Sequence, residues 1–423
     1  MNPRELLLAS FQAAVAAADP LTIVPRHLPA VPRGRTVVVG AGKAAAAMAV
    51  AVERHWPADA PLGGVVITRY GHGLPTTRIR VVEAGHPVPD EQGEAAAREI
   101  LALASGLSAD DLLLVLVSGG GSALLSLPVP EVPMADLKAV TRALLASGAP
   151  IQEMNIVRKH LSAIQGGRLA AASRARVLAL VISDVTGDDP THIASGPCAA
   201  DPSTYADAAE ILRRAGVAAP ASVSAHLAAG IAGGRDETPK SGDSAFARTE
   251  NRVIATAQAS LAAAAGFFRA SGIAAMVLGD GVTGESREVA KPYAALARQV
   301  RLHGEPARAP VALISGGETT VTVRGEGRGG RCSEFLLGLA IELDGLAGVH
   351  ALACDTDGID GSEDNAGAIV GPDTLARATA KGLDVRRLLA ANDAYRLFAG
   401  LGDLVVTGPT RTNVNDYRVI LVA

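Results

Sequence analysis

The stretch LLLVLVSGGGSALLS, residues 112–126, decides the fold class. Six consecutive Leu and Val residues are typical of a strand covered on both faces, and they run straight into Ser118, three glycines and Ser122. Glycines let backbone amides approach a ligand closely, and oxyanions suit such amides. The stretches VVVGAGK (37–43) and VALISGGET (311–319) also end apolar runs in glycine turns. Three such strands predict an α/β protein with a cleft for phosphates.

Length and composition narrow the class of protein. A chain of 423 residues exceeds the roughly 250–300 residues that one core serves, so we expect two domains. A net charge of −4 and a single Trp argue against nucleic-acid binding. Three cysteines without CxxC spacing fit a reducing compartment and predict a cytoplasmic protein. No run approaches the roughly 18 apolar residues of a membrane helix, so we expect no membrane partner.

The N-terminus resembles a signal peptide because Arg4 precedes a mostly apolar run. Glu5 and Gln12 interrupt that run. One helical face collects the apolar side chains of Leu6, Leu7, Phe11, Ala14 and Val15. We therefore interpret these residues as a first helix.

Strands and helices alternate along both halves of the chain. In the first half, short β-branched runs alternate with Ala-rich helical stretches, which predicts a Rossmann-like domain with a mostly parallel sheet over residues 1–235. The polar run AGGRDETPKSGDSAFARTEN (232–251) marks the boundary. A second, smaller α/β domain is predicted over 250–423, in which TTVTVR (319–324) alternates like a strand with one wet face.

The first glycine turn, VVVGAGKAA (37–45), satisfies the loose GxGxxA form of the dinucleotide fingerprint. The acid that should end the next strand is missing, because VVITRY (65–70) offers Arg69, which leaves an NADP site open. Lys43 at the start of the helix suits a phosphate, and a solvated surface lysine is the alternative. The second glycine loop fails the GxSxG nucleophile elbow at Leu124, and a tight turn without a ligand is its alternative.

Acidic side chains gather in two runs. VISDVTGDDPTHIASGP (181–197) places Asp184, Asp188 and Asp189 within six residues, a set that would suit a metal–nucleotide or would only form turns. ACDTDGIDGSEDN (353–365) is denser, but Gly358 directly follows Asp357, so the order of a calcium-binding EF-hand loop fails.

Three further motifs carry polar groups of interest. RGEGRGGRCSE (324–334) offers arginines that would fold over a phosphate, or else a solvated hairpin. TGPTRTNVND (407–416) supplies Asn413 and Asn415, which would read hydroxyls or a base, or cap a turn. Arg158 and Lys159 would hold a carboxylate or phosphate, or form a basic helix face; His86 ranks low because lone histidines are more often structural.

Taken in order, these motifs resemble those of the glycerate 2-kinase family, whose members carry a C-terminal MOFRL domain and some of which are labelled hydroxypyruvate reductase. The resemblance runs from about Glu5 to Val422. It implies two α/β domains with the active site in the cleft between them. It also implies transfer of the ATP γ-phosphoryl group to the 2-hydroxyl of D-glycerate with Mg²⁺.

The resemblance also assigns roles to residues. It implies that Lys43 and Arg331 are catalytic, and that Asp184 and Asp357 face the cleft as metal or hydroxyl partners. Cys332, Ser333 and Arg411 depart from the family pattern, which usually has Asn-Gln after GGR and Gly in GPTGTN.

The full expectation combines the resemblance with the motifs. Catalysis is assigned to Lys43, Arg331 and Asp184, and substrate binding to His86, Arg158, Lys159 and Asp357. ATP binding is assigned to Gly42, Ser118, Gly119, Gly120, Gly121, Ser122, Gly316, Gly317, Glu318, Asn413 and Asn415, and metal binding to Asp184, Asp189 and Asp357. An NADP-dependent hydroxypyruvate reductase and a non-catalytic binding module are the alternatives, and a homodimer is left open.

Overall fold

The computed structural model describes residues 2–423, which form two compact units. The central unit comprises residues 20–254, and the terminal unit joins the residues up to 19 with residues 255–423. Within residues 2–423 no single helix is long and apolar enough to span a membrane; one pair, Pro3–Ala16 with Pro20–His27, meets the length and composition together but is bent by 47°.

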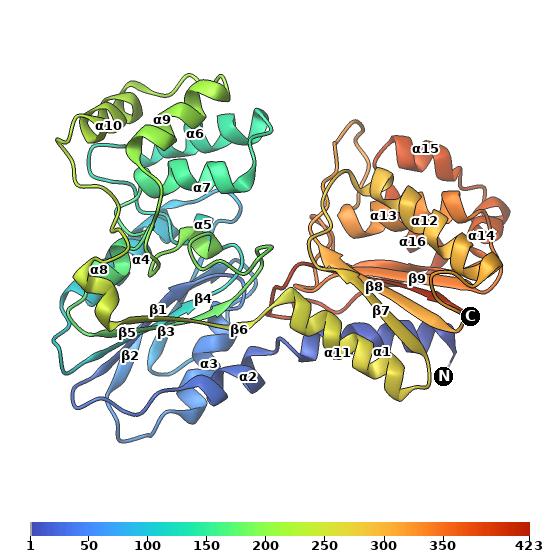
Figure 1. Ribbon diagram of the computed structural model, residues 1–423, viewed down its shortest axis with the longest axis horizontal. Helices are drawn as coiled ribbons and strands as arrows, with labels where there is room; N and C mark the ends of the chain where they lie inside the picture. The colour runs from blue at the N-terminus through green and yellow to red at the C-terminus, as the bar shows by residue number, and fades with distance from the viewer. Residues whose placement is uncertain (1) are drawn as a thin grey trace. The chain divides into compact units, whose positions relative to one another are not determined.

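The central unit is built on a six-stranded sheet (Figure 1). Its strands lie in the order β3 (Ile79–Ala84), β2 (Leu62–Arg69), β1 (Thr36–Ala41), β4 (Leu112–Val117), β5 (Arg176–Ile182) and β6 (Thr249–Ala255). The pairs from β3 through β5 are parallel, which confirms the predicted parallel sheet. This is the Rossmann strand order, and it reverses between β1 and β4. Ligands of such sheets bind where the order reverses, at the carboxyl ends of the strands.

Helices cover both faces of this sheet (Figure 1). One face carries α2 (Pro20–Ile23), η1 (Val24–His27) and α3 (Ala45–His55), and the other carries α4 (Glu91–Ser105) and α8 (Arg168–Ala171). Every residue of β1 and β4 is buried, as their unbroken apolar sequence predicts. The short helical turns α5 (Gly121–Leu124) and η2 (Ile193–Ser195) come after β4 and β5, and η3 (Ser244–Arg248) directly precedes β6.

A group of four helices stands beyond the sheet (Figure 1). It consists of α6 (Met134–Ala146), α7 (Ile151–His160), α9 (Tyr205–Arg214) and α10 (Ala221–Ile231). These helices share a separate core that includes Leu144, Val157 and Leu212. Their position brings the basic end of α7 to the carboxyl edge of the sheet.

The terminal unit holds a mixed sheet. Its strands lie in the order β11 (Leu404–Val405), β10 (Gly367–Val370), β9 (Val349–Asp355), β12 (Asp416–Val422), β8 (Val311–Gly317) and β7 (Ala274–Gly279). Only the β7–β8 pair is parallel among these strands of residues 2–423. One face carries α12 (Ser286–His303), α13 (Arg331–Leu343), α14 (Thr374–Ala380), α15 (Val385–Ala390) and α16 (Ala394–Leu401).

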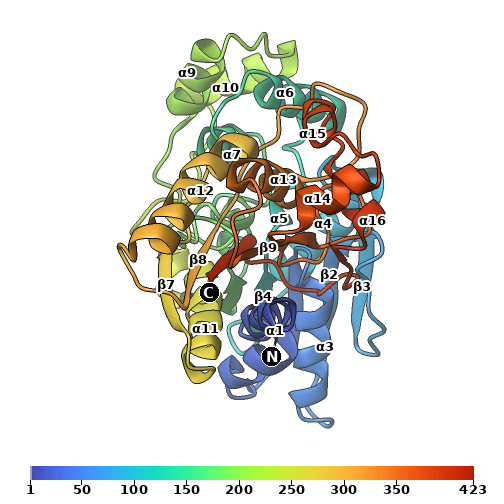
Figure 2. The same ribbon diagram turned by 90° about the vertical axis from the view of Figure 1, so that its right-hand side faces the viewer.

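The other face of the mixed sheet carries α1 (Pro3–Ala16) beside α11 (Ala257–Ala270) (Figures 1 and 2). The predicted apolar face of the first helix is the buried one, since Leu7 and Phe11 share a core with Leu261 and Phe268. The domain prediction was wrong for this helix, because it counted residues 1–19 with the first domain. The amphipathic pattern of the helix predicts that its apolar face is buried, but it does not indicate which sheet covers that face.

The predicted strand at 319–324 was also wrong. This segment makes a single bridge, Thr320 to Glu285, and is otherwise irregular. Side chains replace a strand partner: the Glu285 carboxylate accepts from the Thr322 amide at 3.0 and 3.1 Å, and Asn392 Oδ1 accepts from the Arg324 amide at 2.7 Å. The alternating pattern is present, but no neighbouring strand edge takes up its backbone groups.

Candidate active site

The glycine loop after β4 lies at the point where the strand order reverses. Gly120 has φ +80° and precedes α5, a conformation that L side chains rarely adopt. Gly121 has no room for a side chain, because a Cβ there would stand 2.5 Å from Ala194 Cβ. Within residues 2–423, the amides of Gly119, Gly120 and Ser122 donate to no protein acceptor. The loop therefore presents bare donors at the edge where a ligand is expected.

The turn after β1 is different, because its amides are already used. The amide of Gly42 donates to Ile67 O at 3.0 Å, that of Lys43 to Gly119 O at 2.9 Å, and that of Ala44 to Ser118 Oγ at 3.0 Å. A dinucleotide site needs the amides of this turn for the pyrophosphate. The hydrogen bonds of this turn therefore hold the end of β1 against β2 and the loop after β4. The Gly42 amide is used within the protein.

Basic side chains from several strands converge beside the glycine loop. His86 follows β3, Lys43 follows β1, Arg69 ends β2 and Arg158 lies in the last turn of α7. A Cβ on Gly120 would lie 2.9 Å from His86 Nε2 and 3.5 Å from Lys43 Cγ. Burial first, and then the charges of Lys43, Arg69, His72 and Arg158, lower the pKa of His86 to about 3. His86 is therefore neutral at pH 7 within a field that attracts anions.

A hydrogen-bonded chain connects the loop to α7. The Ser195 hydroxyl lies 2.9 Å from Ser122 Oγ and 3.2 Å from Asn155 Oδ1, which also accepts from Arg158 Nη1 at 3.3 Å. Ala194 and Ser195 have φ of +50° and +59°, so the turn that carries Ser195 is strained. The sequence analysis gave Ser195 and Asn155 no role. The one available signal was the ASGP turn at residues 194–197.

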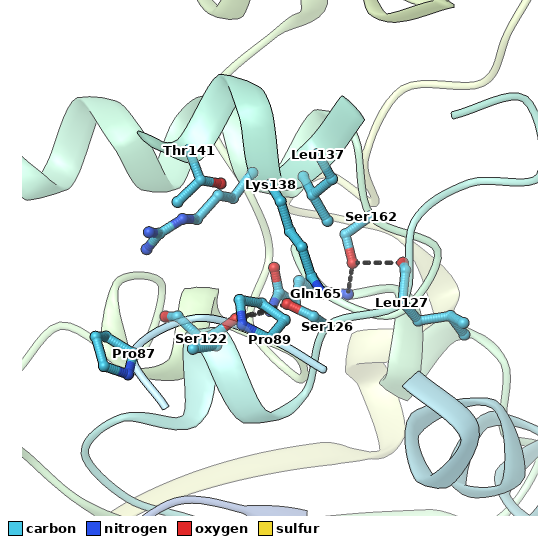
Figure 3. Close-up of a pocket in the computed structure, with 12 residues that line it drawn as sticks. Pro87, Pro89, Ser122, Ser126, Leu127, Leu137, Lys138, Thr141, Ser162 and Gln165 are labelled. Carbon is cyan, nitrogen blue, oxygen red and sulfur yellow. Dashed lines mark hydrogen bonds between the residues drawn. The ribbon is translucent and has the colours of Figure 1, made fainter. Parts of the chain in front are cut away.

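A narrow hollow opens behind Ser122 in the central unit (Figure 3). Its volume is about 10 Å³, room for about one water molecule, and its polar lining comprises Arg158, Lys138, Thr141, Ser122, Ser126, Ser162 and Gln165. Lys138 extends from α6 towards Gln165 (Figure 3). Gln165 Nε2 donates to Ser122 O at 2.9 Å and to Leu125 O at 3.0 Å, which fixes the short helix α5. The hollow combines two cations with hydroxyl groups, as a small hydroxy acid requires.

The acids of the first acidic run lie on the loop after β5. Register pairs Val181 with Val117, so Asp184 follows its strand close to where the glycine loop follows β4. Asp184 is half-buried, whereas Asp189 is exposed and accepts from the Thr191 amide at 2.8 Å. Among residues 2–423, no three His, Cys, Asp or Glu side chains are grouped to hold a metal ion. Asp184 and Asp189 are thus at most part of a site that a ligand completes.

Lys159, predicted to bind substrate, points into the protein. Its Nζ lies 3.2 Å from Asp201 Oδ1, and both side chains are buried. The Lys159 charge lowers the pKa of the Asp201 carboxyl against the opposing, larger effect of burial. Arg158 and Lys159 are neighbours in the sequence, but the helix directs only Arg158 to the hollow. The ion pair accounts for Lys159 without a substrate.

In the terminal unit, Arg331 begins α13 and is held by three carboxylates. Its Nε bonds Asp416 Oδ1 at 2.7 Å, Nη1 bonds Glu318 Oε1 at 2.7 Å and Nη2 bonds Asp355 Oδ2 at 2.8 Å. Burial lowers the pKa of Arg331, but the three acids together raise it well above its ordinary value. Asp355 and Asp416 are buried, whereas the Glu318 side chain is 55% exposed. Nη1 is therefore the nitrogen of this guanidinium whose carboxylate partner is exposed and can be replaced by a ligand.

The start of α13 is fixed by Asp360, which sequence reasoning gave no role. Its fully buried carboxylate accepts from the amides of Cys332 at 2.9 Å and Ser333 at 2.8 Å. A Cβ on Gly330 would meet Asp360 Oδ1 at 2.2 Å, so the glycine admits this acid. The helix N-terminus is consequently capped by a carboxylate. Cys332 and Ser333, which depart from the family pattern, are both buried.

The remaining predicted residues of the terminal unit lie at the ends of its strands. Gly317 has φ +115°, and a Cβ there would meet Val282 O at 2.3 Å, so packing alone requires glycine. Asp357 is buried, and its Oδ1 accepts from the Ile359 amide at 2.9 Å. Asn413 and Asn415 are buried in one turn, where Asn415 O accepts from Thr356. The assignments of Gly316, Gly317, Asn413 and Asn415 to ATP and of Asp357 to substrate and metal stay predictions.

Comparison with known proteins identifies the family. A family model described as "Domain of unknown function (DUF4147)" matches residues 6–228, and the MOFRL family model matches residues 311–416. A protein of Agrobacterium vitis named "Putative hydroxypyruvate reductase" is 52% identical, covering 100% of this chain and 95% of its own. The "D-glycerate 2-kinase" of Thermotoga maritima is 38% identical over 99% of this chain and 98% of its own length.

A solved structure agrees with these relatives. The crystal structure of glycerate kinase from Thermotoga maritima matches with a TM-score of 0.88 at 38% identity, over 99% of each chain. The match extends over both α/β units, and both family models fall in the order that the motifs predict. This chain belongs to the glycerate 2-kinase family, with a DUF4147 region followed by a MOFRL domain.

Proposed function

We propose that this protein is a glycerate 2-kinase, which transfers the γ-phosphoryl group of ATP to the 2-hydroxyl of D-glycerate. One observation carries the proposal: Lys43, Arg69, His86 and Arg158 converge on a loop whose amides at Gly119, Gly120 and Ser122 are unused. Phosphoryl transfer is catalysed by positioning and charge stabilisation more than by covalent chemistry. Fixed amides and cations provide both.

The roles follow from which groups can reach a ligand. The loop amides bind phosphoryl oxygens, and Lys43 beside them neutralises the charge that develops on the transferred group. Arg158 and Lys138 in the hollow bind the carboxylate of glycerate. Neutral His86 offers Nε2 to a substrate hydroxyl. Asp184, at the end of β5, accepts the hydroxyl proton.

Arg331 binds the phosphoryl group through Nη1. Asp355 and Asp416 hold Nε and Nη2 in a buried frame, whereas the exposed Glu318 gives way to a phosphoryl oxygen on Nη1. Mutation of Glu318 to Gln should preserve the guanidinium position because the two buried acids remain.

Magnesium fits the acids that are present. Mg²⁺ takes one or two carboxylates and completes its shell with phosphate oxygens and water. Asp184 and Asp189 share one loop, and residues 2–423 contain no group of three acids that would form an all-protein cage. Asp189 would hold the ion from this loop, which leaves Asp184 as the proton acceptor. When bound, the ion would neutralise charge on the phosphoryl groups.

The direct test is incubation with ATP and D-glycerate, with the product identified by ³¹P and ¹H NMR as 2- or 3-phosphoglycerate. Lys43→Met should lower kcat by about 10²–10³-fold, the range found when one charge-stabilising donor is removed. Arg98→Ala removes an exposed cation from the same unit, paired only with Glu94, and should leave kcat unchanged. Equal rates for wild type and Lys43→Met would refute the role of Lys43, and absence of any phosphorylated glycerate would refute the function.

Hydroxypyruvate reduction is the second candidate, because the Agrobacterium vitis relative bears that name. The amides of Gly42, Lys43 and Ala44 count against it, since all three are bonded within the protein and none is left for a dinucleotide pyrophosphate. We expect no oxidation of NADPH or NADH at 340 nm when hydroxypyruvate is added. We also propose a cytoplasmic location, which the three free, buried cysteines support.

A further inference from the structure

A wide groove lies wholly within the terminal unit, and its walls differ from those of the hollow in the central unit. Its volume is about 270 Å³, whereas that of the hollow in the central unit is about 10 Å³. One wall comes from the irregular segment that was predicted as a strand, with Val321 and Val323. The other comes from the backbone of the loop at Gly327–Gly330 and from Ala394 of α16. Arg331 closes one end.

The groove exposes apolar surface. Val323 is 75% exposed, the largest exposure among the large hydrophobic side chains of residues 2–423. Val321 and Ala394 extend the apolar wall. Binding sites for flat organic groups are mostly apolar with a few polar groups that set orientation, and volumes of about 300–1,000 Å³ are typical. At about 270 Å³ the groove lies just below this range, and its lining has this composition.

The walls are held in place before any ligand arrives. Asn392 Oδ1 accepts from the amides of Arg324 and Gly325, and its Nδ2 donates to Glu334 at 2.9 Å. The Gly327 amide donates to Ala391 O at 3.0 Å, and a Cβ at residue 327 would stand 2.5 Å from that oxygen. The Arg328 guanidinium stacks 4.5 Å from the Tyr395 ring centroid. The glycines at residues 325, 327 and 330 are therefore required by packing.

The charged side chains around the groove determine which part of a nucleotide it suits. The only cation on the groove wall of residues 319–394 is Arg331, and Glu318, Asp355 and Asp416 more than balance it. The amides at the start of α13 are capped by Asp360. A whole triphosphate would meet excess negative charge here, beyond the one phosphoryl oxygen that Nη1 of Arg331 takes, whereas an uncharged base would not. Carboxylates such as Glu318 instead accept hydrogen bonds from ribose hydroxyls.

We propose that this groove binds the adenosine moiety of ATP, with the base against Val321 and Val323 and the ribose towards Glu318. The proposal rests on the proposed kinase function, and it assigns the two substrates to two separate hollows. The small, hydroxyl-lined and cationic hollow at Arg158 takes the hydroxy acid, and the larger apolar groove takes the nucleoside.

Val323 provides a clean test because its exposure makes it unnecessary for folding. Val323→Asp should raise KM for ATP by about tenfold or more, while KM for D-glycerate and the melting temperature stay at wild-type values. Val323→Asn removes the apolar contact without adding charge and should raise KM for ATP in the same direction. Val406→Asp is the matched control, since Val406 is 60% exposed in the same unit but does not line the groove. Unchanged KM for ATP in both Val323 variants would overturn the proposal.

Photolabelling reads the site without relying on activity. Irradiation of the wild-type protein with 8-azido-ATP should label the peptide that contains residues 319–330, and excess ATP should suppress the label. Labelling of residues 118–126 instead would overturn the groove assignment. If wild type labels at 319–330 but phosphorylates no glycerate, the proposed function fails while the nucleoside site stands, so the two failures are distinguishable.

Discussion

His86 Nε2 occupies the space that a side chain at residue 120 would need: a Cβ added to Gly120 would stand 2.9 Å from it. The absent side chain at Gly120 is what admits the imidazole to the glycine loop, next to Lys43. The left-handed conformation of Gly120 forms the turn, and its lack of a Cβ makes room for the neutral His86.

Gly120→Ala should separate these two effects. Alanine at φ +80° costs about 1–2 kcal/mol of stability, and its Cβ displaces His86. Gly148→Ala imposes the same strain at φ +74° with nothing within 4 Å of the new Cβ. We expect similar small losses of thermal stability for both variants, and a loss of kinase activity of at least about tenfold for Gly120→Ala alone. Equal activities in the two variants would show that His86 placement is unimportant.

The buried pair of Lys159 and Asp201 should be structural. Lys159→Met leaves the Asp201 carboxylate buried without its cation and should cost about 3–5 kcal/mol in the free energy of unfolding. Arg98→Ala breaks an exposed pair with Glu94 and should cost less than about 0.5 kcal/mol. Urea denaturation measures both. KM for D-glycerate should not change in folded Lys159→Met, and a large increase would restore Lys159 to the substrate site.

Asp360 should lower the free energy of unfolding as the pH rises from about 4 to 6, which is the opposite of the usual effect of a native carboxylate. Burial raises its pKa to about 6 against the bonds from Ser333 and Cys332, above the roughly 3.9 of an unfolded chain. Between about pH 4 and 6 the folded state holds more protons than the unfolded state, so this contribution to stability is present at pH 4 and is lost as pH rises to 6. Asp360→Asn cannot titrate. Wild type should therefore lose stability relative to Asp360→Asn over this interval, and parallel curves would contradict the assignment.

Phe11 lies near the N-terminus and should stabilise the terminal unit, most of which comes from residues 255–423. It packs 6.0 Å from the Tyr417 ring centroid and is buried against α11. Phe11→Ala should cost about 3–5 kcal/mol. Hydrogen exchange should accelerate in β12 but not in β4, because β4 belongs to the other unit. Leu302→Ala, at a 62% exposed position of α12, is the control and should leave both strands protected.

Local sequence predicted most of the regular structure. The strand predicted at 112–117 matches β4 residue for residue, and the glycine turns after β1, β4 and β8 lie at strand ends as expected. Such features depend on the period of apolar residues and on the freedom of glycine, both of which act over a few neighbouring residues. The motifs also sufficed for the family, which the relatives and the solved structure confirm.

The partners of each local element were beyond local sequence. The first helix was recognised, but not its place on the second sheet; TTVTVR alternates like a strand, but no strand edge receives it. The same limit applies to the glycines. The sequence treats GAGK and SGGGS alike, yet the amides at Gly42, Lys43 and Ala44 bond the protein, whereas Gly119 and Gly120 keep unused amides.

The sequence by itself determined the α/β class, the strands that end in glycine and the kinase family, because each is written in short-range patterns. Tertiary structure alone decided which glycine loop keeps its donors, that Lys43, Arg69, His86 and Arg158 meet, and that Lys159 turns to Asp201. The physical reason is that these outcomes depend on contacts between segments tens to hundreds of residues apart. Strand order and packing, which no local pattern specifies, bring those segments together.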